Sequence, residues 1–441
     1  MQSYSFFYLH IYTPYRNLHY LHTLVMKVLN KLRYLAVICV MFLLPSNSFS
    51  QWVNLYSENI KTMRTIVNND WEKLPILHLN SDDYITISFD EMSHTYNRFT
   101  YHITHCDANW KPSDLYESDF IEGFNDMPVD DYENSINTTF EYTHYTFNIP
   151  NDDTSLKLSG NYLVEIIDED GECVADAKFS VTEDYANIAA SVSSNTDLDI
   201  NGRHQQLTMS ISHSGIRVLD QTKEILPYVI MNRDITNMIS GFKPTHRSNN
   251  KMEYSHCKEL IFNAGNEYRR FEIIDMYDYT QNVDRIDFHT PYYHATLLTD
   301  RPHIAYRHDN DHNGRYLVRS HNAGSSDIEA DYLFVHFTLI SNRLSGGNLY
   351  LRGDFSGNNI TDNWKMSYNE EMKAYTITVL LKQGSYDYQY IWLPDNGKGS
   401  MTERTEGDCY ETGNEYTILV YFRENGARYD RLIGFNTFVS R

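Results

Sequence analysis

Residues 84–89 read YITISF, and this stretch decides the class of fold. Its apolar residues fall at alternate positions, Ile85, Ile87 and Phe89, so that one face of an extended chain would be apolar. The same period of two recurs in YTITVLL (375–381), YDYQYIW (386–392) and YTILVYF (416–422), whose residue types suit a pleated, half-buried surface. Because long windows with helical periodicity are scarce, the sequence predicts a mostly all-β chain of tandem β-sandwiches.

Asp-Gly and Asn-Gly dipeptides separate many of these runs, as they do in tight hairpins, because both residues tolerate positive φ. They stand at positions 170–171, 201–202, 313–314, 396–397 and 425–426. The polar stretches SVSSNTDLDINGRHQ and AGSSDIEADY indicate two boundaries between larger blocks. We therefore expect three β-domains, at residues 51–185, 186–328 and 329–441.

The stretch KVLNKLRYLAVICVMFLLPSNSFSQ, which begins at Lys27, is typical of an export signal. Three basic residues precede an apolar run at 34–44 that is too short to span a bilayer, and small residues precede Gln51. We expect a cleaved signal peptide at 26–50 that starts at Met26. Residues 1–25 would then be an upstream extension from a misassigned start codon, and the mature chain would work in an envelope-facing compartment.

The chain is acidic, with a formal net charge of −22 at pH 7, and removal of residues 1–50, which carry four basic and no acidic side chains, would leave −26. Such a charge repels the phosphates of nucleic acids, so no nucleic-acid partner is expected. No later segment has the run of about 18 apolar residues that a transmembrane helix needs. Four widely spaced cysteines remain, and both disulfides and free thiols stay open for them: Cys106, Cys173, Cys257 and Cys409.

The sequence contains none of the motifs G-x-S-x-G, H-E-x-x-H, G-x-x-x-x-G-K-[ST] and G-x-G-x-x-G. DNDHNG at 309–314 matches the first half of a calcium loop, but Ser320 stands where the bidentate glutamate belongs, which favours a plain turn. His303, His308 and His312 are close in sequence, and a zinc site there is an alternative, although their spacings on strand-and-turn sequence do not bring them together. We expect a protein that is not an enzyme and holds no cofactor or metal.

The third block carries the stretch LYLRGDFSGNNITDNWKMSYNEEMKAYTITVLLKQGSYDYQYIW, residues 349–392. It resembles the early-set β-sandwich modules that bind starch and glycogen, which would make the tandem sandwiches immunoglobulin-like or early-set-like. The resemblance implies that Trp364 and Trp392 are platforms on which sugar rings stack.

Across the whole mature length, the residues resemble one family. The first block has CDANWKPSDLYESDFIEGFND and LSGNYLVEIID, the second has GNEYRRFEIIDM, and the third closes with EYTILVYFRENGARYDRLIGF. These stretches resemble the Bacteroidota family of type IX secretion system plug proteins, formerly a family of unknown function. The resemblance implies a periplasmic protein at the inner face of the outer membrane that binds the giant β-barrel translocon and seals its channel when no cargo is passing.

The abundance of tyrosine, 36 residues, would suit a protein–protein interface, since this side chain is large and amphipathic. Candidate contacts are Trp110 and the tyrosines Tyr142 and Tyr145, although aromatic residues in β-domains more often fill the core. The alternative function is a periplasmic or surface glycan-binding protein that uses Trp364 and Trp392. The oligomeric state stays open.

Overall fold

The computed structural model describes residues 51–440 except 279, 304, 322, 359 and 397–400. The expected upstream extension and signal peptide therefore lie outside the described residues. The prediction of a mostly all-β chain of tandem β-sandwiches is confirmed, because the strands form paired sheets around three apolar cores. Within the described residues, none of the helices is long and apolar enough to cross a membrane.

The first sandwich takes its strands from the first predicted block. One layer contains β1 (Val53–Leu55), β3 (Ile76–His78), β5 (Thr100–Cys106), β7 (Met127–Pro128), β11 (Gly160–Ile167) and β12 (Cys173–Thr182). The other contains β2 (Ile60–Val67), β4 (Ile85–Glu91), β8 (Asp131–Asn134) and β9 (Thr143–Ile149), and β6 (Ile121–Gly123) pairs separately with β10 (Thr154–Leu156). As the alternation in YITISF predicts, Ile85, Ile87 and Phe89 of β4 are fully buried.

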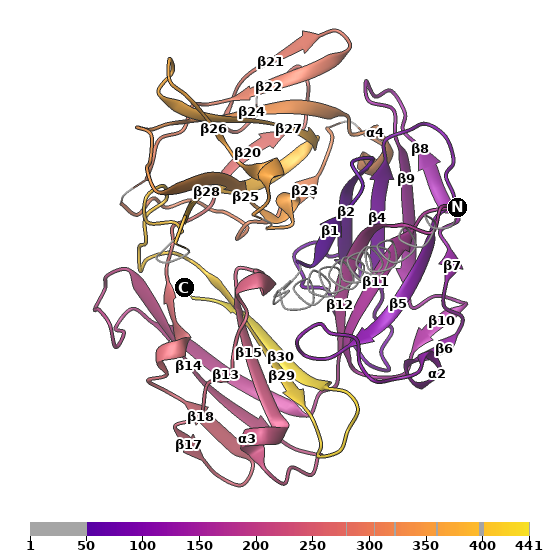
Figure 1. Ribbon diagram of the computed structural model, residues 1–441, viewed down its shortest axis with the longest axis vertical. Helices are drawn as coiled ribbons and strands as arrows, with labels where there is room; N and C mark the ends of the chain where they lie inside the picture. The colour runs from indigo at the N-terminus through magenta and orange to yellow at the C-terminus, as the bar shows by residue number, and fades with distance from the viewer. Residues whose placement is uncertain are drawn as a thin grey trace, which may run out of the picture. The chain divides into compact units, whose positions relative to one another are not determined.

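The second sandwich combines strands that lie far apart in sequence. One layer contains β13 (Ala186–Ser193), β14 (His204–His213), β17 (His246–Arg247), β18 (Lys251–Tyr254) and β19 (Ile261–Asn263). The other contains β15 (Ile225–Met231), β16 (Ile239–Ser240), β29 (Glu415–Phe422) and β30 (Arg431–Val439). Figure 1 shows β29 and β30 in yellow beside β15.

In the sequence, the strands of the third sandwich lie between β19 and β29, which both belong to the second sandwich. One layer contains β20 (Arg269–Ile273), β23 (Tyr316–Val318), β25 (Gly347–Arg352) and β28 (Gly384–Pro394). The other contains β21 (Val283–His289), β22 (Tyr292–Leu297), β24 (Tyr332–Ile340), β26 (Ser367–Asn369) and β27 (Ala374–Lys382). In β28 residues 384–392 are all buried, so this strand is covered on both faces and not half-buried as its alternation suggests.

The sheets group differently from three consecutive blocks. Strands β20 to β23 precede the expected boundary at 328/329 but belong to the third sandwich, while β29 and β30 follow it and complete the second. The third sandwich is thus an insertion into the second. Its topology depends on pairing between β15 and β29, which are separated by more than 180 residues, and alternation along one strand carries no information about its partner.

A ten-stranded sheet links the first and second sandwiches in the order β16-β15-β29-β30-β12-β11-β5-β7, with β1 and β3 also paired to β12. Strands β30 and β12 meet at Leu432 and Thr182. A fourth apolar cluster, which includes Trp52, Tyr228 and Tyr421, packs at this junction. The helices are short: α2 (Glu117–Phe120), α3 (Gln221–Glu224), α4 (Ser326–Glu329) and the single 3-10 turns η1 (Ile235–Asn237), η2 (Lys258–Leu260), η3 (Asp354–Ser356) and η4 (Asp362–Trp364).

Three of the five Gly dipeptides connect antiparallel neighbours, as expected. They are 170–171 between β11 and β12, 201–202 between β13 and β14, and 425–426 between β29 and β30. Positions 313–314 form a turn before β23, and Gly397 lies outside the described residues. Among the described residues, the four cysteines are free thiols.

Candidate functional site

Fifteen of the tyrosines that the structure describes are buried. Eleven of them are among the largest fully buried side chains. Tyr142 and Tyr145, both predicted as contact residues, are 0% exposed. The Tyr145 hydroxyl donates to the carbonyl of Asn97 at 2.9 Å and accepts from its amide at 2.8 Å, which fixes the ring inside the first sandwich.

Of the predicted tryptophans, Trp364 and Trp392 pack in the core of the third sandwich and Trp110 packs at the junction of the first and second. Trp110 is half-buried, with its ring edge-on to that of Trp52 at 5.7 Å between centroids. Trp364 is half-buried against Phe355 at 5.5 Å. Trp392 is only 2% exposed and lies under Arg404, so it offers no open ring face to a sugar. The structure therefore does not bring Trp364 and Trp392 together as an exposed platform, and their binding role stays a prediction.

A buried ion pair joins the first and third sandwiches. Lys382 Nζ, at the end of β27, lies 2.6 Å from Asp90 Oδ2 of β4, and both side chains are at most 1% exposed. His144 Nδ1 lies 2.6 Å from the other Asp90 oxygen, and the Tyr332 hydroxyl donates to Asp90 at 2.7 Å. Lys382 also lies 4.1 Å above the centre of the Tyr142 ring. The aromatic residue that the sequence suggested as a partner contact is thus part of this internal junction.

The electrostatic balance at Asp90 favours the carboxylate. Burial raises the pKa of Asp90, but attraction to Lys382 and the contact with His144 outweigh that effect and hold the pKa at about 2. Burial lowers the pKa of Lys382, and Asp90 opposes this. Asp90 is therefore ionised at neutral pH, and its short contact with Lys382 fixes the relative position of β4 and β27.

Further buried or half-buried ion pairs lie at the other junctions. Arg64 of β2 contacts Asp327 of α4 at 2.6 Å, and Arg352 of β25 binds Asp234, which also caps η1. Other pairs are Arg315–Glu415 at 2.7 Å, Arg233–Asp354 at 3.3 Å and Arg431–Glu183. Every pair of sandwiches is therefore connected by charged contacts as well as by packing.

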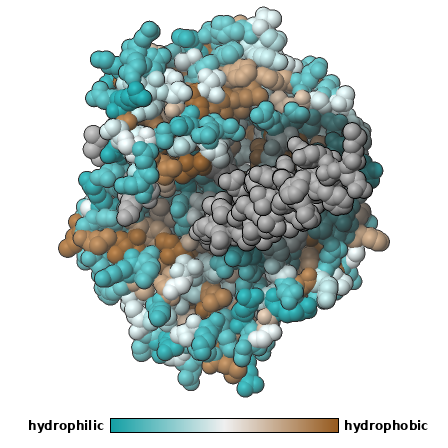
Figure 2. Space-filling model, viewed as in Figure 1, coloured by the Kyte–Doolittle hydropathy of each residue, from teal (hydrophilic) through white to brown (hydrophobic). Residues whose placement is uncertain are grey.

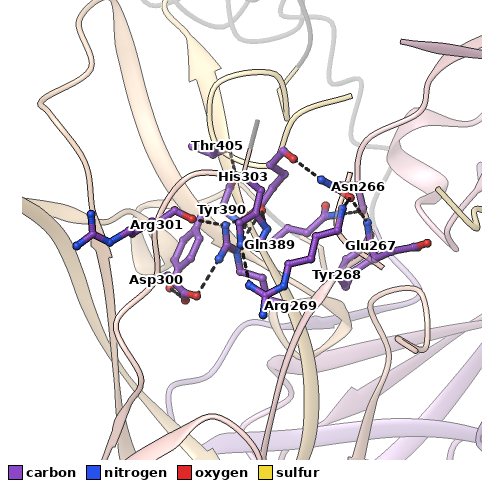
Figure 3. Close-up of polar contacts among 12 residues, drawn as sticks. Asn266, Glu267, Tyr268, Arg269, Asp300, Arg301, His303, Gln389, Tyr390 and Thr405 are labelled. Atoms are coloured by element: carbon purple, nitrogen blue, oxygen red, sulfur yellow. Dashed lines mark hydrogen bonds and ion pairs between the residues drawn. The ribbon is translucent and has the colours of Figure 1, made fainter. Parts of the chain in front are cut away.

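A cluster around Arg269 lies on the face of β28 that carries Tyr388 and Tyr390, and Figure 3 shows its polar contacts. Arg269 Nε donates to both oxygens of Glu406 at 3.0 Å, and its Nη1 donates to Asp300 at 2.8 Å. The hydroxyls of Tyr388 and Tyr390 donate to the second Asp300 oxygen at 2.9 and 2.8 Å. Tyr388 and Tyr390 also belong to the core of the third sandwich, so the cluster lies on the core side of β28.

The charges in this cluster neutralise one another. Burial lowers the pKa of Arg269, but Glu406 and Asp300 outweigh the effect and raise it. Burial and the positive charge of Arg269 lower the pKa of His303 to about 4, so this imidazole is neutral at physiological pH. Because each carboxylate is engaged by the guanidinium, the arrangement suits a structural tie better than proton transfer or nucleophilic attack.

The calcium-like loop packs onto β28 through two acids. Asp311 accepts from the amide of Tyr268, and Asp387 accepts from the amides of His312 and Gly314. Burial and the neighbouring carboxylate of Asp387 raise the pKa of Asp311 to about 8, and burial raises that of Asp387 to about 7. Among the described residues, no group of three or more His, Cys, Asp or Glu side chains is arranged to hold a metal ion.

The charged residues at the junctions were not identified from the sequence. Asp90, Lys382, Arg269 and Glu406 stand in ordinary strand and loop sequence, and their partners lie more than 100 residues away. The loop at 309–314 was noticed only as an incomplete calcium motif. A charged residue within an apolar alternation, such as Asp90 directly after Phe89, is the one signal that points to a buried partner.

Comparison with known proteins supplies relatives for this arrangement. The family model described as the type 9 secretion system plug protein 1st domain matches residues 60–183, which run from the start of β2 to the end of β12. The chain is similar to a hypothetical protein from Parabacteroides merdae ATCC 43184 with a known crystal structure, at 38% identity and a TM-score of 0.86. That match covers 89% of this chain and 100% of the other. No curated protein matches the sequence.

Proposed function

The chain belongs to the type 9 secretion system plug protein family, and from this premise we propose that it is a non-enzymatic plug of the secretion translocon. It binds the periplasmic side of the large outer-membrane barrel and seals the channel when no cargo is passing. The family match over the first sandwich is the observation that carries the proposal.

Rigidity of the chain supports this role. A plug must keep its shape against a wide channel, and a body that is already ordered pays little conformational entropy on binding. The ion pair of Asp90 with Lys382 and the pair of Arg352 with Asp234 hold the sandwiches in fixed contact. Such buried pairs are directional, so they favour one arrangement of the sandwiches over others.

The protein surface suits a polar interface with a partner that is attracted by charge. On the face seen in Figure 2, hydrophilic side chains predominate and hydrophobic residues occur in small groups. With a formal net charge of −22, the protein would be guided toward a basic rim of the channel, and high salt should slow its association. Within the described part of the chain, the exposed tyrosines are Tyr56, Tyr96, Tyr116, Tyr132, Tyr185 and Tyr277.

The proposed location is the periplasm, at the inner face of the outer membrane, after removal of the predicted signal peptide. The experiment that tests the function is affinity purification of the tagged protein from the detergent-solubilised envelope of its own host, with mass spectrometry of the captured proteins. Recovery of one very large outer-membrane barrel supports the plug. Its absence under conditions that recover other envelope complexes would overturn a stable complex.

Matched variants connect capture to the surface. Tyr116→Ala and Tyr277→Ala change side chains that are 77% and 83% exposed, and we expect a combined variant to capture less barrel at an unchanged melting temperature. Tyr145→Phe, which removes buried hydrogen bonds, should lower the melting temperature without lowering capture from folded protein. Deletion of the gene should make the outer membrane permeable to large antibiotics only while the translocon is present.

A further inference from the structure

Three histidines gather on the outer face of the sheet β21-β22-β24-β27-β26. His294 of β22 and His336 of β24 are half-buried, and His289 at the end of β21 is exposed. The intervening residues Ala295 and Val335 point to the other side, into the core of the third sandwich. The histidine face is therefore accessible from outside the core.

The two half-buried rings are placed as ligands of one ion would be. His294 Nδ1 lies 3.0 Å from His336 Nε2, and the rings are stacked with centroids 5.2 Å apart. Two imidazole nitrogens at about 2.0–2.1 Å from one metal lie about 2.9 Å apart at a right angle and about 3.3 Å apart at a tetrahedral angle. The observed separation lies within that interval, so little rearrangement is needed to admit an ion.

A hydrogen bond to Thr378 can set the tautomer of His336. His336 Nδ1 lies 2.8 Å from the Thr378 hydroxyl on β27. When this nitrogen donates to Thr378, the lone pair of Nε2 points to His294, which is the orientation that metal-bound histidines receive from their outer partners. Without an ion, His294 Nδ1–H donates to this lone pair. A shift of that proton to Nε2 of His294 gives two facing lone pairs with no change in charge.

We propose that His294 and His336 form a two-histidine site for a borderline divalent transition-metal ion such as Zn²⁺, Ni²⁺ or Cu²⁺. Imidazole is a preferred ligand of these ions, and water completes the coordination. His289, whose ring centroid is 5.1 Å from that of His294, lies exposed at the edge of the same face. A bound ion would tie β22 to β24 across their parallel pairing.

Neighbouring charge sets the expected strength of binding. Arg285 of β21 pairs with Thr296, which lies in register with His336, so its guanidinium adds positive charge to this face. Its Nε donates to Asp287 at 2.9 Å, and this contact compensates part of the charge. We therefore expect moderate affinity that increases when Arg285 is replaced by alanine.

Calorimetric titration of the purified, metal-stripped protein with ZnCl₂, and separately with NiCl₂, tests the site. We expect one saturable equivalent, with affinity reduced by about tenfold or more in His294→Ala and in His336→Ala, and by about tenfold in Thr378→Val. His246→Ala, an exposed histidine of β17 in the second sandwich, is the matched control and should leave the affinity unchanged.

A spectroscopic measurement keeps the test independent of folding defects. With one equivalent of Cu²⁺, electron paramagnetic resonance of the native protein should show coupling to at least two imidazole nitrogens. The proposal is overturned if the native protein binds no better than the double variant His294→Ala/His336→Ala, or if the copper spectrum shows fewer than two nitrogen ligands. Either result would leave the 3.0 Å contact as an ordinary hydrogen bond between two rings.

Discussion

Asp90 is a buried carboxylate and Asp311 a half-buried one, and their surroundings have opposite effects on the pKa. Lys382 and His144 surround Asp90 and hold its pKa at about 2 although burial alone would raise it. Asp311 lies near another acid, Asp387, and burial with this like charge raises its pKa to about 8. The junction between sandwiches thus contains a compensated charge, while the loop on β28 contains acids that are more stable when protonated.

The two regions make folding depend on pH with opposite signs. A depressed pKa such as that of Asp90 adds stability above the unfolded value of 3.8, and this stability is lost as pH falls toward about 2. A raised pKa such as that of Asp311 gives stability that is complete below 3.8 and is lost as pH rises through about 8. The two regions are therefore tested at opposite ends of the pH scale.

The largest effect is expected when Asp90 loses its partner. Lys382→Met should lower the free energy of unfolding by about 3–5 kcal/mol, because it leaves a carboxylate buried without its cation. Urea denaturation at pH 7 measures the change. The double variant Asp90→Asn/Lys382→Met should recover part of the loss. Lys223→Met, at a lysine side chain that is 82% exposed, is the control and should change little.

Removal of the ionisable acid from the loop should stabilise the protein in alkaline solution. Asp311→Asn keeps the shape and the acceptor for the Tyr268 amide, and should raise the free energy of unfolding at pH 9 by about 2 kcal/mol, with little change at pH 4. Denaturant curves at both pH values provide the measurement. The exposed substitution Asp130→Asn should show no such difference, and an equal effect at both pH values would contradict the raised pKa.

Acid should weaken the junction in a defined window. Between about pH 4 and pH 2, protonation of Asp90 should remove about 2 kcal/mol of stability from the native protein. The comparison is with Asp90→Asn/Lys382→Met, whose loss over the same window should be smaller by that amount. If the free energy of unfolding fell equally with pH in the two proteins, Asp90 would not be held in its charged form.

The smallest effect is expected at an exposed ion pair. Arg343 and Glu370 are 2.9 Å apart, but their side chains are 70% and 71% exposed. Arg343→Ala should change the free energy of unfolding by less than about 0.5 kcal/mol, because water screens the pair and competes for both groups. Thermal melts in low and high salt measure it. If Arg343→Ala lowered the free energy of unfolding as much as Lys382→Met, burial would not explain why the two ion pairs differ in strength.

Much of the local structure could be predicted from the sequence. Ile85, Ile87 and Phe89 alternate as β4 requires, and Asp170-Gly171 stands at the turn between β11 and β12. These features depend on neighbours in the chain. The pairing of β29 with β15 depends instead on residues far apart in the chain, and the alternation in β29 would suit several partner strands. The insertion of the third sandwich therefore could not be deduced from the sequence.

The site residues were harder to predict for a related reason. The residue type of Tyr142 and Tyr145 predicts contacts with a partner, but both side chains are buried. Tyr145 lies on β9 between β4 and β8, and Tyr142 directly precedes β9. The pairs of Lys382 and Arg269 arise only once distant strands meet. Residue type alone does not distinguish an interface tyrosine from a core tyrosine, since both roles use its ring and its hydroxyl.

The insertion of the third sandwich into the second determines when the molecule is complete. Core residues Tyr416, Ile418 and Ile433 come from β29 and β30, so the second sandwich stays open until these strands have been synthesised. A prematurely terminated chain would leave the apolar residues of β14 and β15 uncovered and open to proteases. Only molecules that contain β29 and β30 can therefore form a closed second core.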